Sequence, residues 1–197
     1  MRVARYADLT AAPWKNGGGV TRQVVVSPPE AGLSDFHWRV SMAVVGSDGP
    51  FSMFPDVDRM LWLLSGGGVE LLRQDGSRDV LHPGQRLDFS AEESIIARLL
   101  GGPVEDLNVM TDRRFAHAAA HEQRLDGEAL FDFPGEWSVV VVRKGYAVVS
   151  TMPGAPRLAY RDCLVMDEPG KTAFLSGHAD LIVISFDRPA PGWDSPA

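Results

Sequence analysis

The segment PWKNGGGVTRQV at positions 13–24 gathers groups that can bind an anion. Lys15 and Asn16 precede three consecutive glycines, and Thr21 and Arg22 follow them. Ordering three glycines costs backbone entropy, so an ordered run should meet a geometric need, either a positive φ or a close approach of the backbone to another group. Backbone N–H groups beside cationic side chains form anion sites. The segment therefore predicts an anion-binding loop, with a mobile N-terminal loop as the alternative.

Strand alternation predicts which later polar residues share a face with a ligand. In the segment WRVSMAVV, Ser41 lies on the same face as Arg39 and leaves room for a ligand among larger neighbours. In DLNVMTD, Asn108 and Met110 share a face, and a buried asparagine needs hydrogen-bond partners. We therefore expect Asn108 to contact the ligand and Met110 to form an apolar wall. The alternatives are a serine bonded to a neighbouring strand and an asparagine that bridges two loops.

Arg59 opens the segment RMLWLL, which is apolar on both strand faces, so its side chain must reach solvent or meet an anion. With Lys15 and Arg22 it would supply positive charge for a mono- or dicarboxylate, which arginine binds through two parallel hydrogen bonds. Thr21 and Arg22 cannot both face the interior of a regular strand, although a bulge beside the glycines would relax this restriction. The predicted ligand-binding residues are Lys15, Asn16, Thr21, Arg22, Ser41, Arg59, Asn108 and Met110, with Trp14, Phe51 and Phe54 as apolar wall or ordinary core.

Groups for proton transfer or nucleophilic attack are few. His37 shares a strand face with Ser41, and Asp106 precedes Asn108, but neither forms a triad with a nucleophile. Cys163 lies far from these motifs in the sequence. No catalytic residue is therefore assigned.

Short apolar runs rich in valine, leucine and isoleucine, punctuated by 20 glycines and 14 prolines, predict an all-β protein. Many short strands are typical of a sandwich or barrel. The segment AHAAAHE at 116–122 has good helix formers without large apolar residues, and we interpret it as a short helix or linker. The expected strands span residues 23–27, 37–44, 60–64, 69–73, 86–89, 95–100, 107–111, 138–143, 147–152, 163–166, 172–175 and 181–186.

Two segments half a chain apart echo each other. LHPGQRLDFSA and MDEPGKTAFLSG each place a Pro-Gly turn, at Pro83 and Pro169, before a strand, and a strand–glycine–strand unit precedes each. The pattern resembles the turns of cupins, which are small β-barrels. It predicts a duplication with a first domain at 1–114 and a second at 115–197, packed as one unit. A chance recurrence of Pro-Gly in a glycine-rich chain is the alternative.

The histidines do not follow the pattern of a cupin metal site. His-x-His, which places two imidazoles on one strand face, is absent, and Arg59 stands where the ligands would begin. His117 and His121 have the spacing of a helical zinc motif, but HAAAH lacks the glutamate of HExxH. We expect no metal ion and no cofactor.

Composition limits the classes of partner. A net charge of -7 disfavours nucleic acid and membrane surfaces, which attract basic proteins. A single cysteine, Cys163, and the lack of a signal peptide or a long apolar run predict a cytoplasmic protein. Edge strands of paired barrels often meet across a two-fold axis, which would allow a homodimer.

WKNGGGVTR closely resembles the hallmark of the HutD/Ves family. Further similarities follow in order: WRVSMAVV, GPFSMFP, LWLLSGGG after Arg59, and DLNVMTDRR, which together cover most of residues 13–114. The chain is therefore identified as a member of this family. It departs at Asp56, where the family commonly has glycine, and an inward-pointing Asp56 would partly neutralise Arg59. Residues 115–197 show little family-specific sequence.

The resemblance implies a bicupin, two fused cupin-like β-barrels of the RmlC-like jelly-roll type, without the usual metal ligands. It also implies an association with bacterial histidine-utilisation genes, where members are expected to modulate catabolism by binding N-formylglutamate or urocanate. Three functions follow: a sensor or buffer of a small anionic metabolite, a metal-independent isomerase or hydrolase acting on a small organic acid, or a structural module without a cavity. The first accounts best for the cationic donors.

Overall fold

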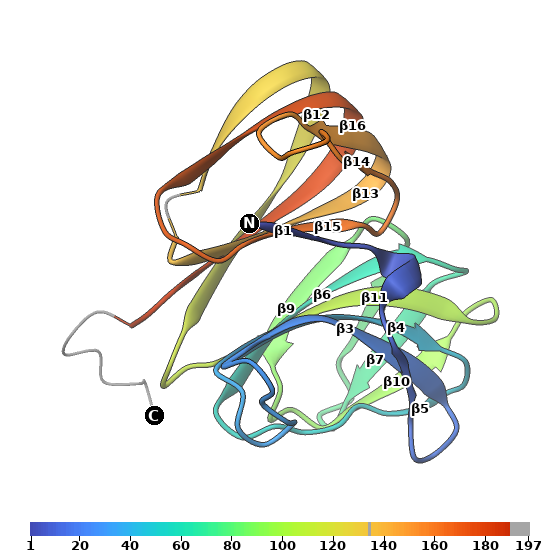
Figure 1. Ribbon diagram of the computed structural model, residues 1–197. Helices are drawn as coiled ribbons and strands as arrows, with labels where there is room; N and C mark the ends of the chain where they lie inside the picture. Colours follow the sequence, from blue (N-terminus) through green and yellow to red (C-terminus); the bar gives the residue numbers. More distant parts are fainter. Residues whose placement is uncertain (134, 190–197) are drawn as a thin grey trace. The chain divides into compact units, whose positions relative to one another are not determined.

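The computed structural model describes residues 1–133 and 135–189, and β-strands form nearly all of their regular structure (Figure 1). The predicted all-β class is confirmed. Within these residues the helical structure is limited to the 3-10 turn η1 (Tyr6–Asp8). No helix in this described part has the length and apolar character needed to cross a membrane.

The chain forms two compact units that divide after Phe115. The N-terminal unit, Thr10–Phe115, carries all the predicted ligand-binding residues. The C-terminal unit comprises Met1–Leu9 and residues 116–189. We expected residues 1–9 in the first domain, but β1 (Arg2–Ala4) instead pairs antiparallel with β15 (Cys163–Met166). A strand of 3 residues carries too little pattern to be recognised from sequence.

Two antiparallel sheets form the N-terminal unit. Apolar side chains from both sheets, among them Leu61, Leu71 and Ile95, pack into one buried core. The inward face of each sheet therefore decides which polar groups are removed from water. The larger sheet has the order β2 (Ala11–Pro13), β3 (Gly19–Ser27), β4 (Trp38–Val45), β11 (Val104–Asp112), β6 (Val57–Ser65), β9 (Arg86–Ser90), and the smaller has the order β5 (Gly49–Pro50), β10 (Ile95–Leu99), β7 (Val69–Arg73), β8 (Arg78–Leu81).

One antiparallel sheet forms the C-terminal unit, with the order β1, β15, β13 (Trp137–Val149), β16 (Lys171–Asp187), β12 (His117–Phe133), and with β14 (Arg157–Leu158) paired to β13. Figure 1 shows β12 and β16 running side by side through a strong bend. Gly127 lies opposite Gly177, and both have positive φ. A Cβ at Gly145 would lie 2.0 Å from the carbonyl oxygen of His178, so this position also requires glycine.

The C-terminal sheet corrects the interpretation of residues 116–122 as a short helix or linker. They lie at the start of β12, where Ala118 pairs with Phe186 of β16. Pairing along the whole ladder outweighs the weak helix propensity of three alanines. His117 and His121 therefore lie on a strand and not on successive turns of a helix.

Some of the strand ends that we predicted at glycines were wrong. The expected strands at 138–143 and 147–152 belong to the single strand β13, and those at 172–175 and 181–186 belong to β16. A bulge between Val142 and Lys144 and the positive-φ glycines bend these strands without ending the ladder. By contrast, Gly84 and Gly170 end the two Pro-Gly turns with φ of 93° and 66°, as the echo predicted.

Candidate functional site

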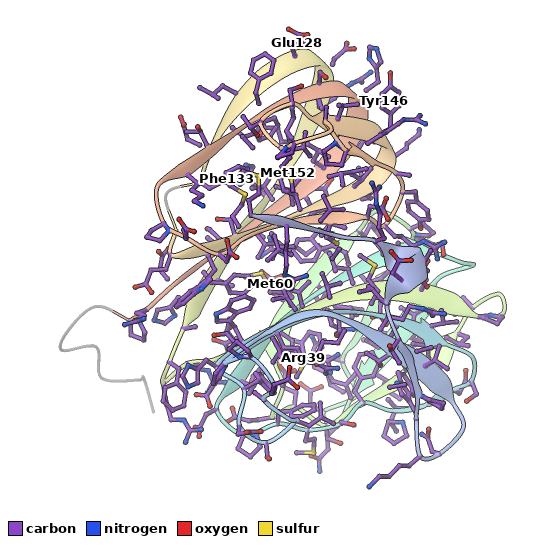
Figure 2. All side chains as sticks on the ribbon, viewed as in Figure 1. Arg39, Met60, Glu128, Phe133, Tyr146 and Met152 are labelled. Carbon is purple, nitrogen blue, oxygen red and sulfur yellow. The ribbon has the colours of Figure 1, made fainter. Side chains whose placement is uncertain are left out.

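A row of polar side chains lies on the inward face of the six-stranded sheet. Directly opposed residues of antiparallel strands point to the same face. Asn108 is opposed by Ser41 and Leu61, while Met110 is opposed by Arg39 and Arg59. Figure 2 shows Arg39 on this face and Met60, the next residue after Arg59, on the other. Alternation thus brings together four of the predicted residues: Ser41, Arg59, Asn108 and Met110.

Three of the buried polar groups in this row form a hydrogen-bonded chain. Arg59 donates from Nη2 to Oδ1 of Asn108, and Asn108 donates from Nδ2 to Oδ1 of Asp106. Only 7% of Arg59, 6% of Asn108 and 3% of Asp106 is exposed. The Nε of Arg59 is buried without a hydrogen-bond partner. A buried donor left unpaired costs about 1–3 kcal/mol, so this edge of the guanidinium favours an acceptor.

Burial shifts the ionisation of both ends of this chain. Desolvation lowers the pKa of Arg59 to about 10, against the opposing effect of Asp106, and the nearby charge of Arg39 lowers it further. Desolvation raises the pKa of Asp106 to about 7 even though Arg59 favours its charged form, and Glu105 adds to the increase. Asp106 is therefore close to half-ionised at neutral pH.

Arg39 places a second guanidinium on the same face. Its Nε donates to Oε1 of Gln23 at 3.0 Å, and burial lowers its pKa. Gln23 is exposed and Arg39 is half-buried, so this end of the row reaches solvent. Two arginines with a solvent-facing end are suited to drawing in an anion.

Aromatic rings cover the guanidinium of Arg59. The ring centroids of Phe51 and Phe89 lie 4.8 Å and 5.3 Å from its central carbon, and the two rings stack at 6.3 Å. Phe51 follows β5 in a segment without regular structure, anchored by its N–H to the carbonyl oxygen of Ile95 at 2.9 Å. Cation–π contact of this kind holds an arginine in place while leaving its planar edge available for hydrogen bonds.

The glycine segment forms a tight turn whose amides bond to neighbouring residues of the same segment. Gly17 has a φ of 72°, and a Cβ at Gly19 would lie 2.5 Å from the carbonyl oxygen of Val44 and 3.0 Å from the ring of Trp14. The expected geometric need for ordered glycines is therefore confirmed. The N–H of Gly17 donates to the carbonyl of Trp14, and that of Gly18 donates to the side chain of Asn16, both at 3.0 Å. These two amides serve the turn and do not form the expected anion cradle.

Thr21 and Arg22, which follow the glycines, lie on opposite faces of the sheet. Thr21 is opposed by Ala43, as Asp106 is, and its hydroxyl accepts a hydrogen bond of 2.8 Å from Nε1 of Trp14. Arg22 is opposed by Met42 and so lies on the other face of the sheet. The bulge in β3 falls between Gln23 and Val25, beyond the position that would have turned Arg22 inward.

Lys15 and Asn16 are exposed in the turn between β2 and β3. Neither belongs to the buried chain of Arg59, Asn108 and Asp106. The structure therefore does not gather all the predicted residues into one place. Gln23, Arg39, Phe89 and Asp106 complete the inward row, and their signal in the sequence was alternation with Ser41 and Asn108.

The other candidate reactive groups lie apart from this row. His37 stacks on Phe115, with ring centroids 4.2 Å apart. Burial raises the pKa of the Cys163 thiol, which disfavours the nucleophilic thiolate. Asp56 adopts a φ of 60° and lies 3.5 Å from Arg114, so its carboxylate pairs there and not with Arg59.

No cluster of three or more His, Cys, Asp or Glu side chains suited to a metal ion occurs within residues 1–133 and 135–189. The inward row instead presents two guanidinium groups, which repel a cation. The side chains around Arg59 therefore do not suit a divalent metal ion.

The C-terminal unit carries an open groove of about 220 Å³ lined by ionic side chains from β12, β13 and β16. His178 and Asp126 approach to 2.7 Å within it, and both are about two-thirds exposed, at 68% and 67%. Water screens such pairs, and none of the predicted ligand-binding residues lines the groove. We therefore place the candidate site in the N-terminal unit.

The all-β architecture has structural neighbours of cupin type. Bacterial pirin YhhW from Escherichia coli superposes with a TM-score of 0.67 over 96% of this chain and 99% of its own, at 10% identity, a likeness that shows the fold alone.

The chain belongs to the HutD family, whose model matches residues 6–183. This confirms the resemblance found in the motifs. An uncharacterized 21.2 kDa protein in the hutC 3' region of Pseudomonas putida is 31% identical over 170 residues, covering 85% of this chain and 87% of that protein. Protein Ves from Citrobacter koseri is 38% identical over 112 residues, covering 55% of this chain and 58% of Ves. The solved structure of HutD from Pseudomonas fluorescens has a TM-score of 0.82 at 27% identity, over 96% and 99% of the two chains.

Proposed function

We propose that the N-terminal unit binds a small carboxylate metabolite and that, through this binding, the protein modulates histidine catabolism in the cytoplasm. The family is associated with histidine utilisation. The observation that carries the proposal is the buried guanidinium of Arg59, whose Nε has no partner while its Nη2 is bonded to Asn108. A carboxylate oxygen would satisfy that donor.

The inward row can orient such a ligand as well as attract it. Arg59 offers a planar edge, Arg39 adds charge at the solvent-reaching end, and Ser41, two residues after Arg39 on β4, adds a hydroxyl. A carboxylate forms charge-assisted bonds to arginine that are roughly twice as strong as neutral ones. Entry to Arg59 would displace Phe51, which lies on the irregular segment beside β5.

The expected ligands are acids produced in histidine breakdown, with N-formylglutamate and urocanate as the first to test. The HutD structure from Pseudomonas fluorescens was obtained in a formate condition. Formate is the smallest carboxylate and shares the group that Arg59 would recognise. The N-terminal unit would then read the carboxylate, and Met110 would contact the apolar part.

We extend the proposal to the architecture as a bicupin. Each unit carries a Pro-Gly turn that enters a strand of a large sheet, at Pro83 before β9 and at Pro169 before β16. Two copies of an ancestral cupin domain would explain this recurrence. The N-terminal copy would differ in keeping the hydrogen-bonded chain of Arg59, Asn108 and Asp106 in its interior.

Asp106 favours one second candidate, a metal-independent isomerase or hydrolase acting on the same acids. Its carboxyl titrates near neutral pH, as a general acid or base requires. It also lies close to the proposed ligand, because Asn108 joins it to Arg59. Incubation of the protein with each acid, followed by NMR of the mixture, distinguishes the two functions. A binding protein leaves every acid unchanged, whereas an enzyme depletes one of them.

The binding proposal is tested by thermal unfolding and calorimetry with formate, N-formylglutamate, urocanate, glutamate and histidine. A ligand that binds only the folded state raises the unfolding midpoint. Arg59→Met should abolish the shift, because it keeps the volume and removes the donors. Arg22→Met is the matched control on the opposite face of the same sheet, and it should leave the shift intact. Equal shifts in the two variants, or none in the unmodified protein, would refute the proposal.

A further inference from the structure

Asp106 shares the buried interior with the group that would hold the ligand. It is joined to Arg59 through the side chain of Asn108, and its own exposure is 3%. The charged or titratable groups that act on this pair are Arg39 on β4 and Glu105 beside Asp106 on β11. Across the core, Leu71, Ile95 and Ala97 present apolar side chains. Arg73, which shares their face at the end of β7, is paired with Asp79 and Glu93. Asp106 is therefore the anion that balances Arg59 when the site is empty.

We propose that the site takes up its carboxylate together with one proton, and that the side chain of Asp106 holds this proton. The inference rests on the proposed function, because it concerns the same ligand at Arg59. It makes Asp106 a positioning residue that sets the protonation state of the complex.

The charges balance in both states. In the empty site above about pH 7, the positive charge of Arg59 is opposed by the mostly ionised carboxylate of Asp106. When the ligand carboxylate pairs with Arg59, two anions would share one buried cation, which is costly in a low-dielectric interior. One proton from solvent therefore adds to the carboxylate of Asp106, whose Oδ1 accepts from Asn108. The complex then contains the guanidinium, the ligand anion and a neutral carboxylic acid.

A neutral Asp106 also gains a donor. Its O–H can bond a second acceptor on the ligand, which favours acids with an oxygen beyond the first carboxylate. N-formylglutamate has such oxygens and formate does not. The proton should therefore contribute to selectivity as well as to charge balance.

Linkage fixes the sign of the pH dependence. The carboxyl of Asp106 has a pKa of about 7 in the empty site, and pairing of Arg59 with a ligand raises it further. Affinity is then constant below about pH 7 and falls as the pH rises, by up to about tenfold per unit, until the pKa of the complex is reached.

The test is calorimetry of the unmodified protein with N-formylglutamate, and with formate in parallel, at about pH 7.5 in phosphate and in Tris. These buffers differ in ionisation enthalpy, so the difference in apparent binding enthalpy counts protons. We expect about 0.5–0.8 proton taken up per ligand bound, because about a quarter of Asp106 is already protonated at this pH. Asp106→Asn keeps an acceptor for Asn108 and should reduce the uptake to zero with a Kd that no longer depends on pH.

The outcomes distinguish a failure of the proton proposal from a failure of the proposed function. Binding with the same enthalpy in both buffers would overturn the proton proposal and leave the binding site in place. Binding with proton uptake that persists in Asp106→Asn would move the proton to another group and also overturn it. No binding of either acid by the unmodified protein would overturn the proposed function and, with it, this inference.

Discussion

The two units differ in the polar groups that they bury. The C-terminal unit surrounds Leu125, Val140 and Leu175 with other apolar side chains, and its described buried polar residues are Ser138 and Asp162, of which Asp162 pairs with Arg5. The N-terminal unit buries Arg59, Asp106 and Asn108 within its sheet. Replacing such groups by apolar residues often leaves stability unchanged or higher, so a buried charged chain is poorly explained by folding alone. The contrast points to a binding role for the N-terminal interior.

The largest expected effect comes from placing a polar group in the apolar interior. Leu175→Asn in the C-terminal unit should lower the free energy of unfolding by about 3–5 kcal/mol, because it removes apolar burial and leaves an amide without partners. Urea unfolding followed by circular dichroism measures the loss. A loss below about 1 kcal/mol, the scale of surface substitutions, would show that this interior tolerates polar groups.

Breaking the polar chain in the N-terminal unit should cost slightly less. Asn108→Leu leaves Arg59 and Asp106 without their shared partner, and we expect a loss of about 2–4 kcal/mol. The triple change Arg59→Met, Asp106→Leu and Asn108→Leu should restore most of this stability and abolish ligand binding. A triple variant less stable than the single one would mean that the chain supports the fold.

The pH dependence of stability should reveal Asp106. Its folded pKa of about 7 lies above the unfolded value, so the native state binds more protons and its stability falls as the pH rises from about 4 to about 7. Asp106→Asn lacks this dependence. Relative to the unmodified protein, it should gain about 2–3 kcal/mol between about pH 5 and about pH 8 in urea unfolding. Parallel pH profiles for the two proteins would contradict a raised pKa.

The glycine segment should show a smaller, local effect. Gly19→Ala places a Cβ against the carbonyl oxygen of Val44 and the ring of Trp14, and we expect a loss of about 1–2 kcal/mol. Gly49→Ala is the control, because a Cβ there meets nothing within 4 Å and the position has no positive φ. Thermal unfolding of both variants checks the difference, which vanishes if the Trp14 ring is free to move.

Sequence patterns predicted what depends on local geometry. The strands at 69–73 and 163–166 match β7 and β15, and alternation placed Ser41 with Arg39 and Asn108 with Met110. Alternation also separated Thr21 from Arg22, but it could not say which of them faces inward. That choice depends on the position of the bulge in β3.

Features set by long-range pairing escaped prediction. Residues 116–122 form a strand because β16 pairs with them, and the first nine residues join the C-terminal unit because β15 offers an edge. The raised pKa of Asp106 arises from complete desolvation, which no motif encodes. Asp56 is different: the common family glycine at its position is explained by the positive φ that the turn requires.

The central claim is that the buried edge of Arg59 binds the ligand, and its Nε–H resonance reports this most directly. In a ¹H–¹⁵N spectrum assigned by loss of the peak in Arg59→Lys, titration with N-formylglutamate should move the Arg59 Nε–H signal downfield as it gains an acceptor, and leave that of Arg22 in place. Saturable binding with an unmoved Arg59 signal, or with movement at Arg22 instead, would contradict the account.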